Sequence, residues 1–134
     1  MDEKPKILVV DDDPDILRAI TKVLQSREYR VVTAANGEEG LDKIREERPD
    51  LLILDLLMPR KDGFAVVREL KESPKFAKHA TMPILILTSV REDASRRRYE
   101  LETGLRMDVD DYVEKPIPPL DLLHRVERLL AKRK

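Results

Sequence analysis

The chain has 134 residues, enough for one domain with a buried core, and we expect residues 1–134 to form a single domain. Charged residues make up 40% of it, but they balance to a net charge of -1, which argues against nucleic acid or an acidic membrane as a partner. The absence of cysteine excludes disulfides and thiolate metal sites. A polar start and the lack of an apolar run as long as a membrane span predict a cytoplasmic protein.

Short apolar runs alternate along the chain with longer amphipathic segments. The short runs predict strands at residues 7–10, 31–32, 51–54, 84–87 and 112–113. The first, third and fourth runs are continuous rather than alternating, as expected of strands that helices cover on both faces.

Apolar residues recur at helical spacing between these strands. The first helix is expected to begin at Pro14, with Asp13 as its N-cap. Other helices are expected between the Asn36-Gly37 turn and Pro49, after Asp62-Gly63, and after Pro118-Pro119.

The segment from Arg91 to Asp110 follows no clean helical period, and Gly104 interrupts it. We expect a helix over part of Asp93 to Thr103 and irregular chain afterwards. The repeated strand–helix order predicts an α/β fold, a doubly wound five-stranded parallel sheet with helices on both faces.

Polar residues with complementary chemistry follow the predicted strands. Asp11, Asp12 and Asp13 end the first, Asp55 ends the third, Thr88 the fourth, and Lys115 follows the fifth. In an open parallel sheet the carboxyl ends of the strands converge where ligands bind. Crowded carboxylates repel one another unless a cation lies among them, and hard oxygen ligands favour Mg²⁺.

Each of these residues also has an ordinary interpretation. An acidic stretch after a strand is typical of a helix N-cap, a threonine is common in strands, and Lys115 alone is typical of a surface lysine. Their joint placement at the ends of several strands of one sheet favours a functional site.

These residues lie in motifs that resemble the receiver domains of two-component response regulators, of the CheY-like superfamily, and the resemblance covers essentially the whole chain. The matching stretches are residues 7–13 (ILVVDDD), 54–59 (LDLLMP) followed by Asp62-Gly63, 83–89 (PILILTS) and 111–116 (DYVEKP). The resemblance implies a flavodoxin-like (βα)5 fold with strand order 2-1-3-4-5.

The resemblance also implies the roles of the site residues. Asp55 would accept a phosphoryl group from a histidine kinase or phosphotransfer protein. Mg²⁺ would be held by Asp12, Asp55 and the backbone carbonyl of Leu57, with Asp11 holding a metal-bound water or a second-shell position. Such a domain catalyses only its own phosphorylation and dephosphorylation and is not a turnover enzyme.

Three further residues complete the implied switch. Lys115 would pair with a phosphoryl oxygen, and Thr88 would donate its hydroxyl to another. Tyr112 would move with Thr88 and alter the surface of the fourth helix, fifth strand and fifth helix, where an unknown downstream protein binds. The family also implies a cis Lys115-Pro116 bond. We expect a monomer or a weak phosphorylation-dependent dimer.

The chain departs from the family pattern at two places. Leu57 and Val90, two residues beyond Asp55 and Thr88, are both apolar. In receivers the side chains at these two positions flank the path of the attacking water. We therefore expect a phosphoryl state that lasts for hours. The stretch between Thr88 and Lys115 is longer than usual, which predicts an enlarged or mobile fourth-helix region.

Other functions remain possible at this point. A haloacid-dehalogenase-type phosphohydrolase also forms an aspartyl phosphate but needs an acid where Leu57 stands, and a dinucleotide-binding domain needs a glycine-rich first turn. A receiver-like protein that binds a partner without phosphorylation stays open. His79 and His124 lack metal-ligand spacing. The arginines at 96–98, with Arg91, are interpreted as a solvated helix face in preference to a docking patch for an acidic partner.

Overall fold

The computed structural model describes residues 3–103 and 107–132, except for the side chains of residues 90–92. Its elements, in chain order, are β1 (Lys6–Val10), α1 (Pro14–Gln25), β2 (Arg30–Ala34), α2 (Gly37–Glu47), β3 (Leu51–Asp55), α3 (Gly63–Glu72), a 3-10 helix η1 (Pro74–His79), β4 (Ile84–Thr88), α4 (Val90–Thr103), β5 (Asp111–Glu114) and α5 (Pro119–Lys132).

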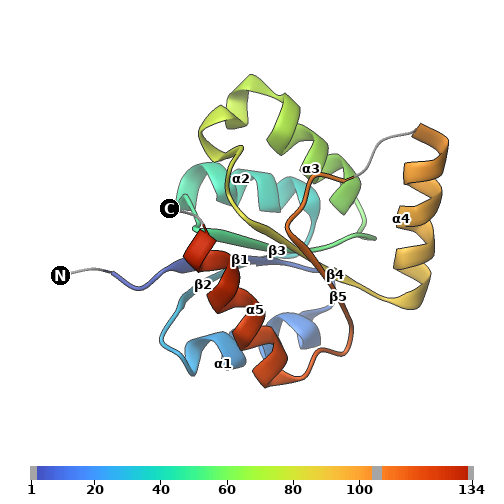
Figure 1. The fold of residues 1–134 in the computed structure, drawn as a ribbon. Helices are drawn as coiled ribbons and strands as arrows, with labels where there is room; N and C mark the ends of the chain where they lie inside the picture. The colour runs from blue at the N-terminus through green and yellow to red at the C-terminus, as the bar shows by residue number, and fades with distance from the viewer. Residues whose placement is uncertain (1–2, 104–106, 133–134) are drawn as a thin grey trace.

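The strands form one parallel sheet in the order β2-β1-β3-β4-β5 (Figure 1). Both the doubly wound α/β fold and this strand order are therefore confirmed. β3 and β4 are buried along their whole length, which explains why their sequences are continuous apolar runs.

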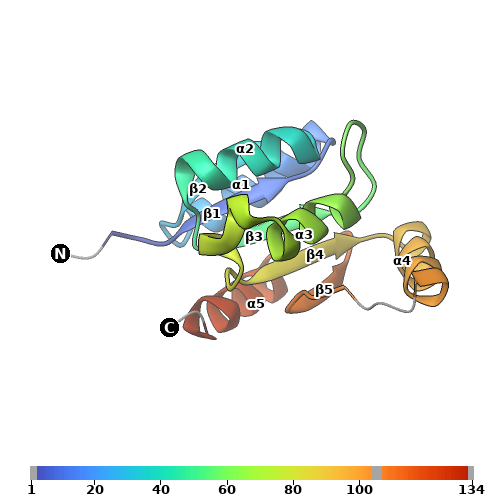
Figure 2. The ribbon, with the colours of Figure 1, turned by 90° about the horizontal axis from the view of Figure 1, so that it is seen from above.

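Two hydrophobic cores lie on opposite faces of the sheet, because successive side chains of a strand point to opposite sides. Helices α1 and α5 cover one face, and α2 and α3 cover the other (Figures 1 and 2). Ile53 packs in the first core and Leu54 in the second. The central strands are thus held from both sides, and the position of their carboxyl ends is well determined.

Helix α1 begins after its predicted N-cap, Asp13, and α2 and α3 begin at the predicted turns, where Asn36 and Asp62 also act as N-caps. Asp13 accepts a hydrogen bond from the backbone N–H of Asp15, and Asn36 accepts one from that of Glu39, both at 2.9 Å. Asp62 likewise caps α3. These side chains satisfy amide groups that the first helical turn leaves without partners.

Helix α4 differs from the sequence prediction. It begins at Val90, before the expected Asp93, and it stands beside both helix layers rather than within one (Figures 1 and 2). Residues 107–110 form no regular element, as predicted, whereas Gly104 lies outside the described residues.

One element was missed from sequence. The short helix η1 connects α3 to β4, with Ser73 as its N-cap and Phe76 buried beneath it at 3% exposure. In the part of the chain that the structure describes, no helix has the length and apolar character needed to cross a membrane.

Candidate functional site

Three carboxylates meet where β1 and β3 end. The two strands pair in parallel, with Val10 opposite Leu54, so the residues that follow, Asp11 and Asp55, lie side by side. Asp11 and Asp55 are buried and Asp12 is exposed. Carboxylate oxygens of all three lie within 4.8 Å of one another. The structure therefore brings together the acidic residues that the sequence predicted.

Lys115 brings a positive charge to the same point from the far end of the chain. Its Nζ lies 3.1 Å from Asp11 Oδ2 and 3.2 Å from Asp55 Oδ1, and its side chain is only 18% exposed. Its backbone N–H donates to the carbonyl of Thr88 at 2.7 Å. The bond from Lys115 to Pro116 is cis, as the resemblance implied.

The two carboxylate oxygens of Asp11 differ in their hydrogen bonding. Its Oδ1 accepts a hydrogen bond from the backbone N–H of Asp13 at 2.9 Å. Apart from the ion pair with Lys115, its buried Oδ2 accepts no hydrogen bond among the described residues. Burial raises the pKa of the Asp11 carboxyl, and the negative charge of Asp55 raises it further, against the opposing effects of Asp13 and Lys115.

This donor set fits a divalent cation with a preference for oxygen. Carboxylates are the ligands that Mg²⁺ takes in proteins, and it keeps part of its water shell. Asp11 offers a buried oxygen with spare acceptor capacity, and exposed Asp12 leaves a route from solvent. The crowding of the carboxylates is itself unfavourable without a cation.

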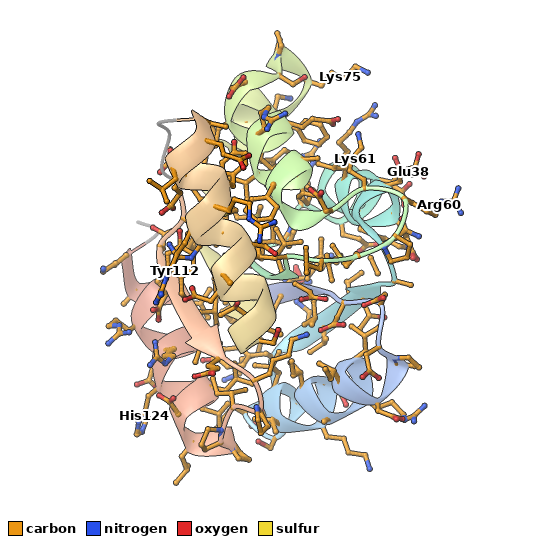
Figure 3. All side chains as sticks on the ribbon, turned by 90° about the vertical axis from the view of Figure 1, so that its right-hand side faces the viewer. Glu38, Arg60, Lys61, Lys75, Tyr112 and His124 are labelled. Carbon is orange, nitrogen blue, oxygen red and sulfur yellow. The ribbon has the colours of Figure 1, made fainter. Side chains whose placement is uncertain are left out.

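The loop after β3 is held close to the carboxylates by glycine. The N–H of Gly63 donates to the carbonyl of Leu56 at 2.8 Å. A Cβ atom on Gly63 would lie 2.5 Å from the carbonyl oxygen of Asp55, so no larger residue fits without movement of the loop. Arg60 also ties this loop to α2 by an ion pair of 2.9 Å with Glu38 (Figure 3).

The predicted switch and water-path residues lie around this centre. Thr88 is buried at 5% exposure, and its hydroxyl donates to the carbonyl of Ser89 at 3.0 Å. Leu57 is partly buried and packs against the core beneath α2 and α3. The side chain of Val90 lies outside the described ones, so its place beside the site stays a prediction.

Thr88 and Tyr112 line the same cavity, which has a volume of about 460 Å³. Tyr112 pairs with Ile86 in the sheet, two positions before Thr88, and side chains two apart point to the same face. The two predicted switch residues are therefore neighbours on the α3 side of the sheet.

Sequence reasoning missed the contact that Arg96 makes with Tyr112. The guanidinium carbon lies 4.4 Å from the centre of the Tyr112 ring. Arg96 is 16% exposed, so the interpretation of this residue as part of a solvated helix face was wrong. Arg97 and Arg98 are exposed, as that interpretation expected.

The two histidines lie apart from the carboxylate cluster in the chain. Burial lowers the pKa of His79, and the nearby charges of Arg48 and Lys78 lower it further. His124 is exposed on α5 and extends outward in Figure 3.

A family model described as the response regulator receiver domain matches residues 7–127. The chain belongs to the response regulator receiver family. This receiver chain is 41% identical over 130 residues to the "Probable transcriptional regulator ycf27" of Porphyra purpurea, in a match that covers 97% of the chain and 49% of that protein. It is 36% identical over 127 residues to the alkaline phosphatase synthesis transcriptional regulatory protein PhoP of Bacillus subtilis, covering 95% of the chain and 49% of that protein.

Solved structures agree with this family. The signal receiver domain of a signal transduction histidine kinase from Syntrophus aciditrophicus superposes with a TM-score of 0.80 at 32% identity, covering 97% of this chain and 94% of that one. The chain spans about half the length of the curated regulators that it matches. The match to a signalling domain favours the receiver interpretation over a phosphohydrolase or a dinucleotide-binding domain.

Proposed function

We propose that this receiver domain accepts a phosphoryl group on Asp55 from a phosphohistidine of a sensor histidine kinase or phosphotransfer protein. The observation that carries the proposal is the buried Asp55 carboxylate, which lies 3.2 Å from the Lys115 ammonium group within a cluster of further carboxylates. The domain acts in the cytoplasm, as a monomer or a weak dimer that forms on phosphorylation.

The chemistry needs a nucleophile that is already ionised. An Asp55 oxygen attacks phosphorus, the bond from phosphorus to the donor's histidine nitrogen breaks, and the resulting acyl phosphate is labile enough to be reversed. Lys115 pairs with Asp55 before transfer and with a phosphoryl oxygen afterwards, as a charged hydrogen-bond donor.

Asp11, Asp12, Asp55 and the backbone carbonyl of Leu57 are the groups that would hold Mg²⁺. When bound, the ion offsets negative charge on the carboxylates and on the transferring phosphoryl group. The buried Oδ2 of Asp11, with its spare acceptor capacity, supports this assignment.

The signal leaves the site through Thr88 and Tyr112. The Thr88 hydroxyl now donates to a neighbouring backbone carbonyl, and a new phosphoryl oxygen offers it a charged acceptor instead. Tyr112 lines the cavity beside Thr88, so a shift of Thr88 changes the space open to the ring. The surface of α4, β5 and α5 then differs between the two states, and a downstream protein binds one of them.

The substitution Asp55→Asn tests the acceptor. We expect the wild-type protein to gain the mass of one phosphoryl group when incubated with acetyl phosphate and MgCl₂, and the variant to gain none, because the amide is not a nucleophile of this kind. Intact-mass spectrometry measures both. Asp108→Asn, which neutralises a carboxylate that is 80% exposed, is the matched control and should label as the wild type does.

Full labelling of Asp55→Asn at the wild-type rate would contradict the assignment. A wild-type protein that takes no label from acetyl phosphate or from phosphohistidine donors would instead favour a receiver that binds its partner without phosphorylation.

We also propose that the phosphoryl group on Asp55 persists for hours, because Leu57 is apolar and neither orients nor admits water well. The substitution Leu57→Asn places an amide that can orient water in the same loop. We expect it to shorten the half-life on the order of tenfold, a modest share of what a positioned proton-transfer group supplies. The decay of the labelled mass after removal of donor measures the half-life.

Leu57→Met, which keeps an apolar group at this position, serves as the control for that experiment and should decay at the wild-type rate. A wild-type half-life under a minute would overturn the proposal of a persistent phosphoryl state.

A further inference from the structure

The described side chains of helix α4 make few contacts with the rest of the molecule. Tyr99 packs on Phe64 of α3 with ring centres 4.9 Å apart, and its hydroxyl accepts a hydrogen bond from Arg68 at 3.2 Å. By contrast, Leu101 is 84% exposed. An amphipathic helix normally buries a continuous apolar stripe, which α4 lacks among its described side chains. Its placement therefore depends on individual side chains.

Arg96 of α4 reaches Tyr112 of β5. Its guanidinium lies over the ring of Tyr112, a cation–π contact with the carbon 4.4 Å from the ring centre. Figure 3 views the molecule from the α4 side and labels Tyr112 beside this helix.

Two acidic residues hold the Arg96 guanidinium in this position. Asp93 lies 2.7 Å from Nη2, and Glu100 lies 3.2 Å from Nη1. Glu100 also accepts a hydrogen bond from the backbone N–H of Met107 at 3.3 Å, which links the arginine to the segment leading into β5. Both acids are partly buried, at 26% and 19% exposure, so these ion pairs are less screened than fully exposed pairs.

The cavity shared by Thr88 and Tyr112 lies next to this contact, and Asp93 is also part of its wall. Its volume of about 460 Å³ is in the range that accommodates a small ligand, so there is room for an aromatic ring. The Tyr112 ring therefore lines a space that it does not fill, while the Arg96 guanidinium lies over the ring.

We propose that Arg96 is a positioning residue that holds the Tyr112 ring at the cavity wall in the unphosphorylated protein, so that phosphorylation of Asp55 takes effect only as this contact is given up. The inference rests on the function proposed above and adds the group that sets its resting state. To enter the cavity, the Tyr112 ring must leave the Arg96 guanidinium. A stronger contact therefore lowers the fraction of unphosphorylated protein in which the ring occupies the cavity.

Removing the guanidinium is then expected to shift the resting protein toward the phosphorylated arrangement. A cation–π contact of ordinary strength changes such a population about fivefold. The arrangement that phosphorylation favours is also the one that reacts, so a larger resting population of it raises the labelling rate in proportion. The reaction with acetyl phosphate is therefore expected to be about fivefold faster in Arg96→Gln than in the wild type.

The position of the ring is measured directly by NMR of protein carrying ¹³C-labelled tyrosine. The chain has three tyrosines, so the Tyr112 signals are assigned by comparison with Tyr112→Phe. In unphosphorylated Arg96→Gln, these signals are expected to move toward the positions they take in the wild type treated with acetyl phosphate and MgCl₂. Arg98→Gln makes the same charge change at an exposed position of the same helix and is expected to match the wild type in both assays.

Arg96→Lys provides a second variant in case Arg96→Gln disturbs α4. Lysine keeps a charge for Asp93 and Glu100 but lacks the planar group that stacks on the ring, so an intermediate shift is expected. Tyr112 signals that stay at their wild-type positions in both variants would overturn the inference, as would moved signals with an unchanged labelling rate. A wild-type protein that takes no label would overturn the proposed function instead, whatever the Tyr112 signals show.

Discussion

Asp11 combines burial with a second negative charge a few ångströms away. Its carboxyl pKa is raised by burial and by Asp55, so the ionised form is less favourable in the folded protein than in the unfolded chain. The contribution of this group to stability is therefore greatest below its unfolded pKa and is lost as the pH rises through the folded pKa. At neutral pH without a divalent cation, the folded protein carries an unfavourable charge at this residue.

The substitution Asp11→Asn removes that charge and keeps an oxygen for the N–H of Asp13. With EDTA present at pH 7, we expect it to raise the free energy of unfolding by about 1 kcal/mol, the usual size of a single-site effect. The gain should shrink as the pH falls below the ordinary aspartate pKa of about 3.9, where the wild-type carboxyl is neutral as well. Urea unfolding at both pH values measures this difference.

With MgCl₂ present, the wild type should become more stable to unfolding than Asp11→Asn. A ligand that binds only the folded state stabilises it, and the variant lacks one of the carboxylates proposed to hold the ion. Asp108→Asn again provides an exposed control, since that carboxylate is 80% exposed and its ion pair with Lys71, at 3.8 Å, is screened by solvent. A variant that is less stable than the wild type at pH 7 in EDTA would show that the Asp11 charge is compensated within the protein.

Helix α4 and strand β3 differ strongly in how much of their surface is buried against the rest of the domain. β3 is buried on both faces of the sheet, whereas the described side chains that attach α4 are Tyr99, Arg96 and Glu100, which accepts from the backbone N–H of Met107. Segments with few buried apolar contacts open locally at low free-energy cost. The amides of α4 are therefore expected to exchange with solvent at least about a hundredfold faster than those of β3.

Hydrogen exchange followed by NMR tests this expectation, with α2 as the internal control. That α-helix also lies beside the sheet but buries Leu41 and Ile44 against it, so its amides should exchange slowly. Exchange in α4 as slow as in the central strands would show that a firmly packed helix has formed from a sequence with little apolar periodicity.

The same contrast explains which elements were predictable. Helices α1, α2 and α3 carry N-caps and apolar residues at helical spacing, and these local signals sufficed. The start of α4 has a cap signal in Ser89 and Glu92 but no regular apolar spacing behind it, and η1 is too short for periodicity to reveal. Its buried Phe76 is a single apolar residue in a polar stretch, which sequence reasoning does not distinguish from a loop.

For the molecule as a whole, the parallel sheet accounts for most of the site. Once the strand order is known, Asp11, Asp55, Thr88 and Lys115 must converge, because each follows or ends a strand whose register the cores determine. The stack of Arg96 on Tyr112 was not predictable in this way. It depends on where an irregular segment places α4, and a run of arginines in sequence is ordinarily solvent-exposed.

The contact between Lys115 and Asp55 joins residues that are 60 positions apart. Such a pair gives nothing to the early stages of folding and forms only when β5 has docked on β4. During synthesis the acidic residues emerge well before the lysine that neutralises them, so the charge cluster is incomplete until the last strand is made. On the function proposed above, only a molecule whose sheet is complete has the full acceptor site, and a partly synthesised chain does not yet react.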